Sequence, residues 1–190
     1  MQCLCYGSYS LLWAFLMQAP DPATKLGKHF AIFAWLLLLG VLYLFFDEQI
    51  AEQLNPNRKL QSSQQQQQVI VTMQANKQGH FVGTLLLNGK PIDFLLDTGA
   101  TMVAVSDEVA AQTGMKKGIA YETSTANGVT TAYQSKINEL RLGDIVLHDL
   151  EASIVPNLDG TEILLGMSAL KHLEFSKREH QLQLIQHKSE

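Results

Sequence analysis

Cysteine is almost absent from this chain, and that absence narrows its chemistry. Both cysteines, Cys3 and Cys5, lie at the extreme N-terminus. The rest of the chain has no disulfide and no thiol nucleophile, and the pair is interpreted as incidental thiols, with metal binding or lipidation as alternatives. The six histidines lack the spacing of a zinc enzyme. No Gly-x-Ser-x-Gly elbow or phosphate-binding loop occurs. We therefore expect neither a metal nor a cofactor.

Strong charge of either sign is lacking as well. The net charge is −4, and no Lys/Arg cluster is interleaved with aromatic residues. This pattern argues against nucleic acid as a partner. With 46% hydrophobic residues in 190, the chain can hold one folded domain and a membrane segment, but not two full domains.

One long apolar run is present, from Phe30 to Phe46, between Lys28-His29 and Asp47-Glu48. As a helix it would span about 26 Å, the short end of the transmembrane range. It shows no amphipathic stripe, which disfavours a buried core helix. A cleaved signal peptide fits less well, because the run is long for such a segment and no small-x-small site follows. We expect an uncleaved transmembrane helix over residues 30–46, in contact with a lipid bilayer.

Basic residues near the run predict its orientation. Lys25 and Lys28 lie close to its N-terminal end, whereas Arg58 and Lys59 follow about a dozen residues beyond the other end. The nearer pair predicts a cytoplasmic segment over residues 1–29 and a main domain on the opposite side of the membrane.

Residues 47–68 are predicted to form a flexible, Gln-rich linker. Asn55-Pro56-Asn57 should end any helix that continues out of the membrane. The glutamine-rich stretch that follows offers nothing to bury.

From Val69 onward, short apolar segments alternate with turn signals, which predicts an all-β domain over residues 69–190. Ser106 can cap a short helix that Gly114 ends. Tight hairpins are expected at Asn88-Gly89, Asn127-Gly128 and Gly143-Asp144. Strands are expected over residues 69–74, 80–87, 91–96, 152–155, 163–165 and 182–185.

The most informative stretch is an apolar strand that runs into the turn Asp97-Thr98-Gly99-Ala100. The Asp97 carboxylate is expected at the end of a buried element, where ionisation is costly. Gly99 can adopt a backbone conformation closed to other residues, which would allow a tight turn. The Thr98 hydroxyl can bond to backbone or to a second copy of the turn. A solvated β-turn is the alternative, and the apolar approach argues against it.

A matching run follows downstream, Leu164-Leu165-Gly166-Met167-Ser168, leading into a short helical pattern. With Asp97-Thr98-Gly99-Ala100-Thr101 and Thr125-Ala126-Asn127-Gly128, it resembles the retropepsin-like (clan AA) aspartic proteases, in particular a bacterial, membrane-anchored branch. The resemblance covers about residues 75 to 187. Retroviral members have Arg-Asn where this chain has Met167-Ser168, so the dimer contacts made there are not carried over.

The resemblance implies a retropepsin-like acid protease barrel with one short C-terminal helix, acting as one subunit of a homodimer. It implies that Asp97 is catalytic, that Thr98, Gly99 and Ala100 form the active-site turn, and that Leu164, Leu165 and Gly166 form the inner strand–helix motif. The polar hairpin would be the flap over the substrate, with Thr125, Ala126, Asn127 and Gly128 at its tip; an ordinary exposed hairpin is the alternative. The family also implies a protease domain in the periplasm, anchored by a single pass in the bacterial inner membrane.

Hydrolysis by carboxylates needs two of them, and the chain offers one Asp-Thr-Gly. Asp159-Gly160-Thr161 has the wrong order and is interpreted as a turn. Asp93 lies about 13 Å from Asp97 along the same strand. We therefore expect Asp97 of two copies to share a water and hydrolyse an extended polypeptide. Residues 69–74 and 182–185 are candidate dimer strands by analogy. A non-catalytic peptide-binding or dimerisation module, and an envelope tether, are the competing hypotheses.

Overall fold

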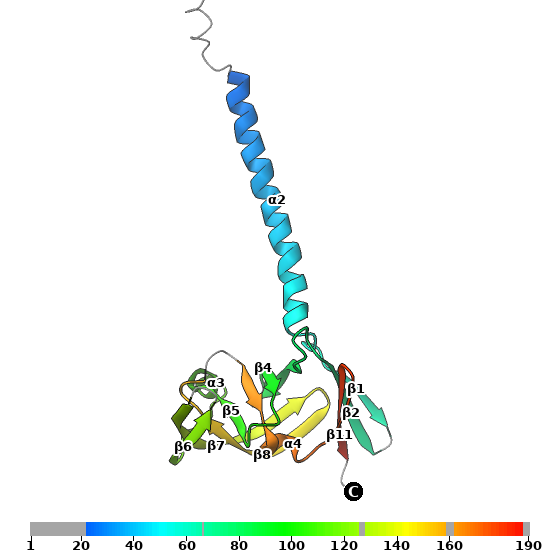
Figure 1. Cartoon of the computed structure of the whole chain (residues 1–190), viewed down its shortest axis with the longest axis vertical. Helices are drawn as coiled ribbons and strands as arrows, with labels where there is room; N and C mark the ends of the chain where they lie inside the picture. Colours follow the sequence, from blue (N-terminus) through cyan, green and yellow to red (C-terminus); the bar gives the residue numbers. More distant parts are fainter. Residues whose placement is uncertain (1–21, 66, 126–127, 159–161, 188–190) are drawn as a thin grey trace, which may run out of the picture. The chain divides into compact units, whose positions relative to one another are not determined.

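In the computed structural model, residues 22–65, 67–125, 128–158 and 162–187 are described. The chain divides into two compact units, residues 1–48 and 49–190. Helix α2 accounts for the described part of the first unit, and the β domain lies in the second (Figure 1).

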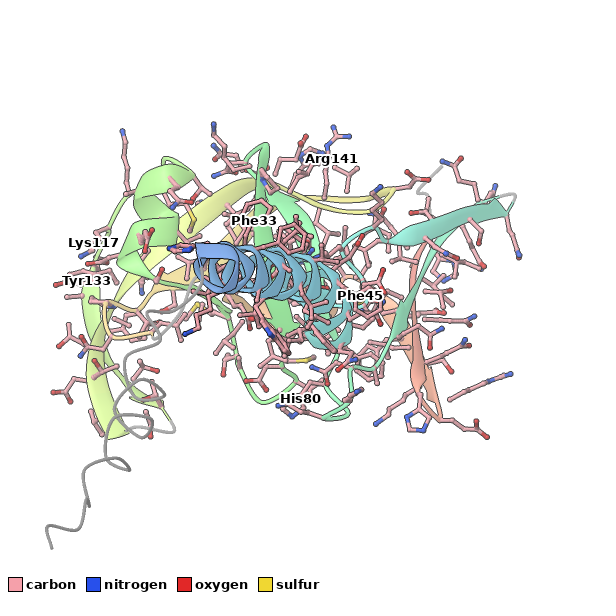
Figure 2. All side chains as sticks on the ribbon, turned by 90° about the horizontal axis from the view of Figure 1, so that it is seen from above. Phe33, Phe45, His80, Lys117, Tyr133 and Arg141 are labelled. Atoms are coloured by element: carbon pink, nitrogen blue, oxygen red, sulfur yellow. The ribbon has the colours of Figure 1, made fainter. Side chains whose placement is uncertain are left out.

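Helix α2 spans Pro22–Leu54 without interruption. The large apolar side chains between Phe30 and Phe46, including Phe33 and Phe45 (Figure 2), are exposed along it. By length and composition, Gly27–Leu54 is a candidate membrane span. The helix therefore contains the predicted span and continues past it, because Asp47 to Leu54 has no helix-breaking residue.

The β domain has two sheets (Figure 1). The smaller one has the order β1-β2-β11-β10, and the larger one has the order β3-β4-β9-β5-β8-β7-β6. An additional pairing of β3 with β7 closes the larger sheet, so its strands form a barrel from which β6 extends. The domain is therefore mostly β, with short helices between strands.

The strands are β1 (Gln61–Gln65), β2 (Gln68–Gln74), β3 (Val82–Leu87), β4 (Lys90–Leu96), β5 (Val103–Val105), β6 (Ala120–Thr125), β7 (Gly128–Leu142), β8 (Ile145–Ile154), β9 (Ile163–Leu165), β10 (Glu174–Arg178) and β11 (Gln181–His187). The short helices are α3 (Asp107–Gln112) and α4 (Met167–Leu170). Strands β1, β5 and β10 were not expected from the sequence.

Turn chemistry explains the local structure where it was predicted. Asn88 and Gly89 have φ values of 48° and 80°, the left-handed geometry of a tight hairpin between β3 and β4. The Ser106 hydroxyl accepts a hydrogen bond from the Val109 amide at 3.2 Å and caps α3. Gly114, with φ of 69°, follows the end of that helix.

A single apolar core joins the two sheets. It includes Val71 and Met73 from β2 and Leu184 from β11, together with Phe94 and Ile163 of the barrel. All five side chains are essentially inaccessible to solvent. Truncating such a side chain to Ala typically costs about 2–5 kcal/mol, so the smaller sheet is an integral part of the domain.

The structure corrects the prediction of a flexible linker over residues 47–68. Residues up to Leu54 are helical, Asn55 and Asn57 are buried, and Gln61–Gln65 forms β1 on the edge of β2. The composition of this segment gives no sign of strand β1, because β1 pairs with β2 through main-chain groups. A glutamine-rich sequence has these groups as any other sequence does. The domain thus begins before Val69.

Candidate active site

Strand β4 carries Asp97 to one end of the barrel. It pairs with β3 in antiparallel and with β9 in parallel, and Phe94 within it is fully buried. The Asp97 amide donates to the Leu165 carbonyl of β9 at 3.2 Å. The aspartate therefore emerges from a strand that is fixed on both edges.

The turn after β4 is held by its own aspartate. Asp97 Oδ1 accepts a hydrogen bond from the Gly99 amide at 2.8 Å, and the Ala100 amide donates to the Asp97 carbonyl at 3.2 Å. Such Asx turns are typical of aspartate. Gly99 does not use the conformational freedom of glycine, since it is not among the residues with positive φ. A side chain at this position would instead be crowded, since a Cβ on residue 99 would lie 3.1 Å from Asp97 Oδ1.

The segment Leu164-Leu165-Gly166 leads into residues that hydrogen-bond to this turn. The Met167 and Ser168 amides donate to the Ala100 and Thr101 carbonyls at 2.8 and 3.0 Å. The structure thus brings the two predicted motifs together, because the first residues of α4 hydrogen-bond to the loop that contains Asp-Thr-Gly.

Ser168 was named in the sequence as the end of the downstream run and as a departure from retroviral relatives, but no role was assigned to it. Its side chain is buried, and its hydroxyl accepts from the Val103 amide at 2.9 Å. It therefore fixes the start of β5. A serine next to the apolar-Gly motif is a weak signal, because its partner lies 65 residues away.

The β6–β7 hairpin lies across the same cavity as Asp97. Its strands are in register from Ala120 opposite Tyr133 to Thr125 opposite Gly128. The Thr125 hydroxyl donates to the Gly128 carbonyl at 2.9 Å. Of the predicted tip residues, Ala126 and Asn127 lie outside the described residues.

Tyr121 connects this hairpin to the barrel. Its hydroxyl is 2.7 Å from the Ser153 hydroxyl on β8. Its ring packs on a small cluster around Ala104, Ala132 and Val155. Sequence reasoning did not identify this contact, because it pairs residues 32 positions apart.

The cavity shared by the turn and the hairpin has a volume of about 770 Å³. Asp97, Thr101, Tyr121, Thr125, Val129, Ser153, Val155 and Leu164 are among the residues that line it. In the part of the chain that the structure describes, Asp97 is the one carboxylate in that lining.

Asp97 is only half-buried, and Thr98 is exposed. This corrects the expectation that water would be scarce around the carboxylate in a single chain, because the turn projects from the end of the barrel. Asp93, on the preceding strand, is bound to Thr84 Oγ1 at 2.5 Å and to Asn55 Nδ2 at 3.2 Å. Asp159 lies outside the described residues.

A second cavity of about 590 Å³ is lined by Lys116, Lys117 and Lys136 and contains no residue of the Asp-Thr-Gly turn. Lys117 Nζ is 2.8 Å from Asp107 Oδ2 and 4.6 Å from the centroid of the Tyr133 ring (Figure 2). These contacts already satisfy the Lys117 ammonium group.

Comparisons with known proteins agree with this geometry. The family model described as "gag-polyprotein putative aspartyl protease" matches residues 83–172, which include the Asp-Thr-Gly turn and the Leu-Leu-Gly run. A protein of Sinorhizobium sp. described as "Uncharacterized protein in cobV 5'region" is 33% identical over 115 residues. That match covers 59% of this chain and 48% of the relative, so the chain spans about half the relative's length.

Solved structures give the fold. A retropepsin-like aspartic protease from Rickettsia conorii matches with 27% identity and a TM-score of 0.53, over 67% of this chain and 96% of that one. The EIAV protease complexed with the inhibitor HBY-793 matches with 17% identity over 48% of this chain and 86% of that one. Its TM-score is 0.39. The β domain has a retropepsin-like aspartic protease fold.

Proposed function

We propose, from this retropepsin-like fold, that the chain is a membrane-anchored aspartic endopeptidase that works as a homodimer. Asp97 of each copy would supply one of the two catalytic carboxylates. Thr98, Gly99 and Ala100 would hold the catalytic turn, and Leu164, Leu165 and Gly166 would support it from below. The β6–β7 hairpin, with Thr125 to Gly128 at its tip, would be the flap that covers the substrate.

The observation that carries this proposal is the position of one carboxylate in a large cavity. Asp97 faces a space of about 770 Å³ beside a hairpin, and the described lining contains no second Asp or Glu. Hydrolysis needs one carboxylate that is ionised and one that is protonated. A second copy of the chain would complete the pair.

The surface around the turn is suited to such a contact. Thr98 is exposed and Asp97 is half-buried in one chain, so both have surface that a partner can cover. The Thr98 hydroxyls of the two copies would bond across the two-fold axis and hold the carboxylates together. Two copies in one membrane are concentrated near each other, which favours pairing through a small interface.

The terminal strands are less available to a partner than expected. Strands β2 and β11 pair with each other, and β1 and β10 occupy their other edges. Residues 69–74 and 182–185 therefore have no open edge in this chain. We place the dimer contact at the face of the Asp-Thr-Gly turn instead.

In the proposed reaction, the ionised Asp97 takes a proton from a water held between the two carboxylates. The protonated Asp97 donates a hydrogen bond to the scissile carbonyl, and the water oxygen attacks the carbonyl carbon. The Asp97 that took the proton from the water then gives it to the leaving amine as the C–N bond breaks. Because the two carboxylates share one proton, they titrate as a pair. The peptide would lie extended under the hairpin and pair with its strands.

Helix α2 would be the anchor, with residues 30–46 in the bilayer. These side chains are exposed in the chain and need an apolar environment. The nearer position of Lys28 favours a cytoplasmic N-terminus. The protease domain would then lie in the periplasm of a bacterial cell.

The proposal is tested with the full chain in nanodiscs, by digestion of an unfolded protein at acidic to neutral pH. Asp97→Asn should lower the rate at least about 100-fold while leaving the fold intact. Asp144→Asn, an exposed aspartate in a β-turn away from the cavity, is the matched control and should keep the activity. Sedimentation of the same samples measures the stoichiometry.

Equal activity of the wild type and Asp97→Asn would overturn the proposal. Peptides that bind the wild type without being cut, with the same affinity for Asp97→Ala, would instead indicate a non-catalytic binding module. A protein that stays monomeric while cleaving would exclude the shared-water mechanism.

A further inference from the structure

The chain is locked into the β domain immediately after helix α2. Asn55 and Asn57 are only 6% and 4% exposed. The Asn57 side chain receives a hydrogen bond from the Gln74 amide at 2.7 Å and donates to the Gln74 and Val82 carbonyls at 2.8 and 2.6 Å. One amide group thus joins the end of β2 to the start of β3.

Asn55 makes the second half of the lock. Its Nδ2 donates to Thr84 Oγ1 and to Asp93 Oδ1, each at 3.2 Å, and its Oδ1 accepts from the Asn57 amide at 3.1 Å. The Thr84 amide in turn donates to the Asn57 carbonyl at 3.3 Å. We call Asn55, Asn57, Thr84 and Asp93 the anchor cluster. Buried amides that are satisfied in this way specify one position of the segment.

Because the anchor cluster holds Asn55 in the β domain, only a short tether connects the domain to the apolar run of the helix. Between Phe46, the last residue of the apolar run, and Asn55 lie the eight residues Asp47 to Leu54. In the structure they are helical, and eight helical residues rise about 12 Å. Even fully extended, they would span only about 28 Å. A free linker over residues 47–68 would have reached about 75 Å.

This length limits where a cleavage site can be reached. A domain of about 130 residues has a radius of gyration of about 14 Å. The extended tether and the domain together therefore reach about 70 Å from the bilayer surface at most. A peptide bond held farther away cannot enter the cavity of an anchored copy.

We propose that the anchor cluster restricts this protein, among polypeptides held at the membrane, to those that expose an extended cleavable segment close to the bilayer surface. The inference rests on the proposed protease function and membrane anchor, and it names their substrate class. Proteins that display their cleavable segments far from the bilayer are poor substrates.

The experiment uses the full chain in liposomes with two anchored substrates that contain the same cleavable sequence. One substrate holds it about 10 residues from the membrane, and the other holds it beyond a rigid helical spacer of about 80 residues, roughly 120 Å long. A matched enzyme variant has about 60 Gly/Ser residues inserted between Glu52 and Gln53, a flexible coil with a typical end-to-end distance of about 40 Å and a maximum of about 200 Å. A soluble peptide of the same sequence reports the state of the active site.

The wild type should cleave the near substrate at least ten times faster than the far one. The insertion variant should cleave the far substrate at least about five times faster than the wild type does, and both enzymes should cleave the soluble peptide equally. Equal cleavage of near and far substrates by the wild type would overturn the inference. Failure to cleave any substrate, the soluble peptide included, would overturn the proposed function instead.

A measurement that does not depend on activity distinguishes this inference from the proposed protease function. Cysteine is introduced at Lys136 or Arg178, both exposed, in a chain with Cys3→Ser and Cys5→Ser, and labelled with a fluorescent donor. Energy transfer to acceptor lipids should be strong in the otherwise native chain and should fall in the insertion variant. Transfer that the insertion leaves unchanged at both positions would show that this tether does not hold the domain at the membrane.

Discussion

Gly166 lies directly against Ala100. A Cβ built on Gly166 would be 2.7 Å from the Ala100 carbonyl oxygen, and the amide of the next residue, Met167, donates to that same oxygen at 2.8 Å. The glycine of the second motif is therefore required because the backbone of the turn after Asp97 passes through the space that a side chain would occupy.

Gly166→Ala should displace the turn that follows Asp97. The clash is with backbone atoms, which cannot move aside cheaply, so we expect the free energy of unfolding to fall by about 1–3 kcal/mol. Proteolytic activity should be lost as well, because the carboxylate moves. Hydrogen exchange of the β domain measures the stability. Gly40→Ala is the control, since nothing lies within 4 Å of its built Cβ; equal stability of the two variants would contradict the packing argument.

Tyr121→Phe should loosen the hairpin without unfolding the domain. The change removes the hydroxyl that lies 2.7 Å from Ser153 and keeps the ring packed. Losing one hydrogen bond of about 1 kcal/mol should raise KM about fivefold and speed hydrogen exchange in β6 and β7. Tyr133→Phe is the matched control, because the contact of Tyr133 with Lys117 involves the ring. If both variants had the same KM, the Tyr121 hydroxyl would have no role in positioning the hairpin.

Asn57→Ala should weaken the anchor cluster. It removes the partner of the Gln74 amide and of the Gln74 and Val82 carbonyls, of which the last bond is buried. We expect a loss of about 1–3 kcal/mol and faster exchange at the start of β3. Asn138→Ala, at an exposed position on β7, should leave both unchanged. Native exchange rates at β3 in Asn57→Ala would show that the segment after α2 is not held by this side chain.

Glu139 and Arg141 provide a test of surface electrostatics. A hydrogen bond from Arg141, 2.7 Å between Nε and Oε1, lowers the pKa of Glu139, with a smaller contribution from the charge of Arg141. Arg141→Gln should therefore raise the Glu139 pKa toward its ordinary value, as measured by NMR titration. The favourable contribution of this pair is present above the unfolded pKa of Glu139 and disappears as the pH falls through its lowered folded value. Arg141 is exposed and Glu139 is partly exposed, so global stability should hardly change.

Local chemistry was readable from the sequence, and distant pairing was not. Asn88-Gly89, Ser106 and the approach to Asp97 each depend on neighbours within a few positions, and the structure has the predicted hairpin, cap and turn. Gly166 was found as part of a motif, but its reason is a contact with Ala100 that only the fold supplies. The anchor cluster was missed because Asn55 and Asn57 read as helix breakers, while their partners lie 17 to 38 residues away. Strand β1 was missed because glutamine carries no periodic apolar signal.

The pairing of β2 with β11 has a consequence for how the protein matures. Gln74 at one end of the ladder is opposite Gln181, more than a hundred positions later in the chain. Val71 and Met73 can therefore be covered only after the last strand has been synthesised and delivered to the same compartment. Because contacts between residues so far apart in sequence form slowly, we expect the enclosure of this part of the core to be a late step of folding.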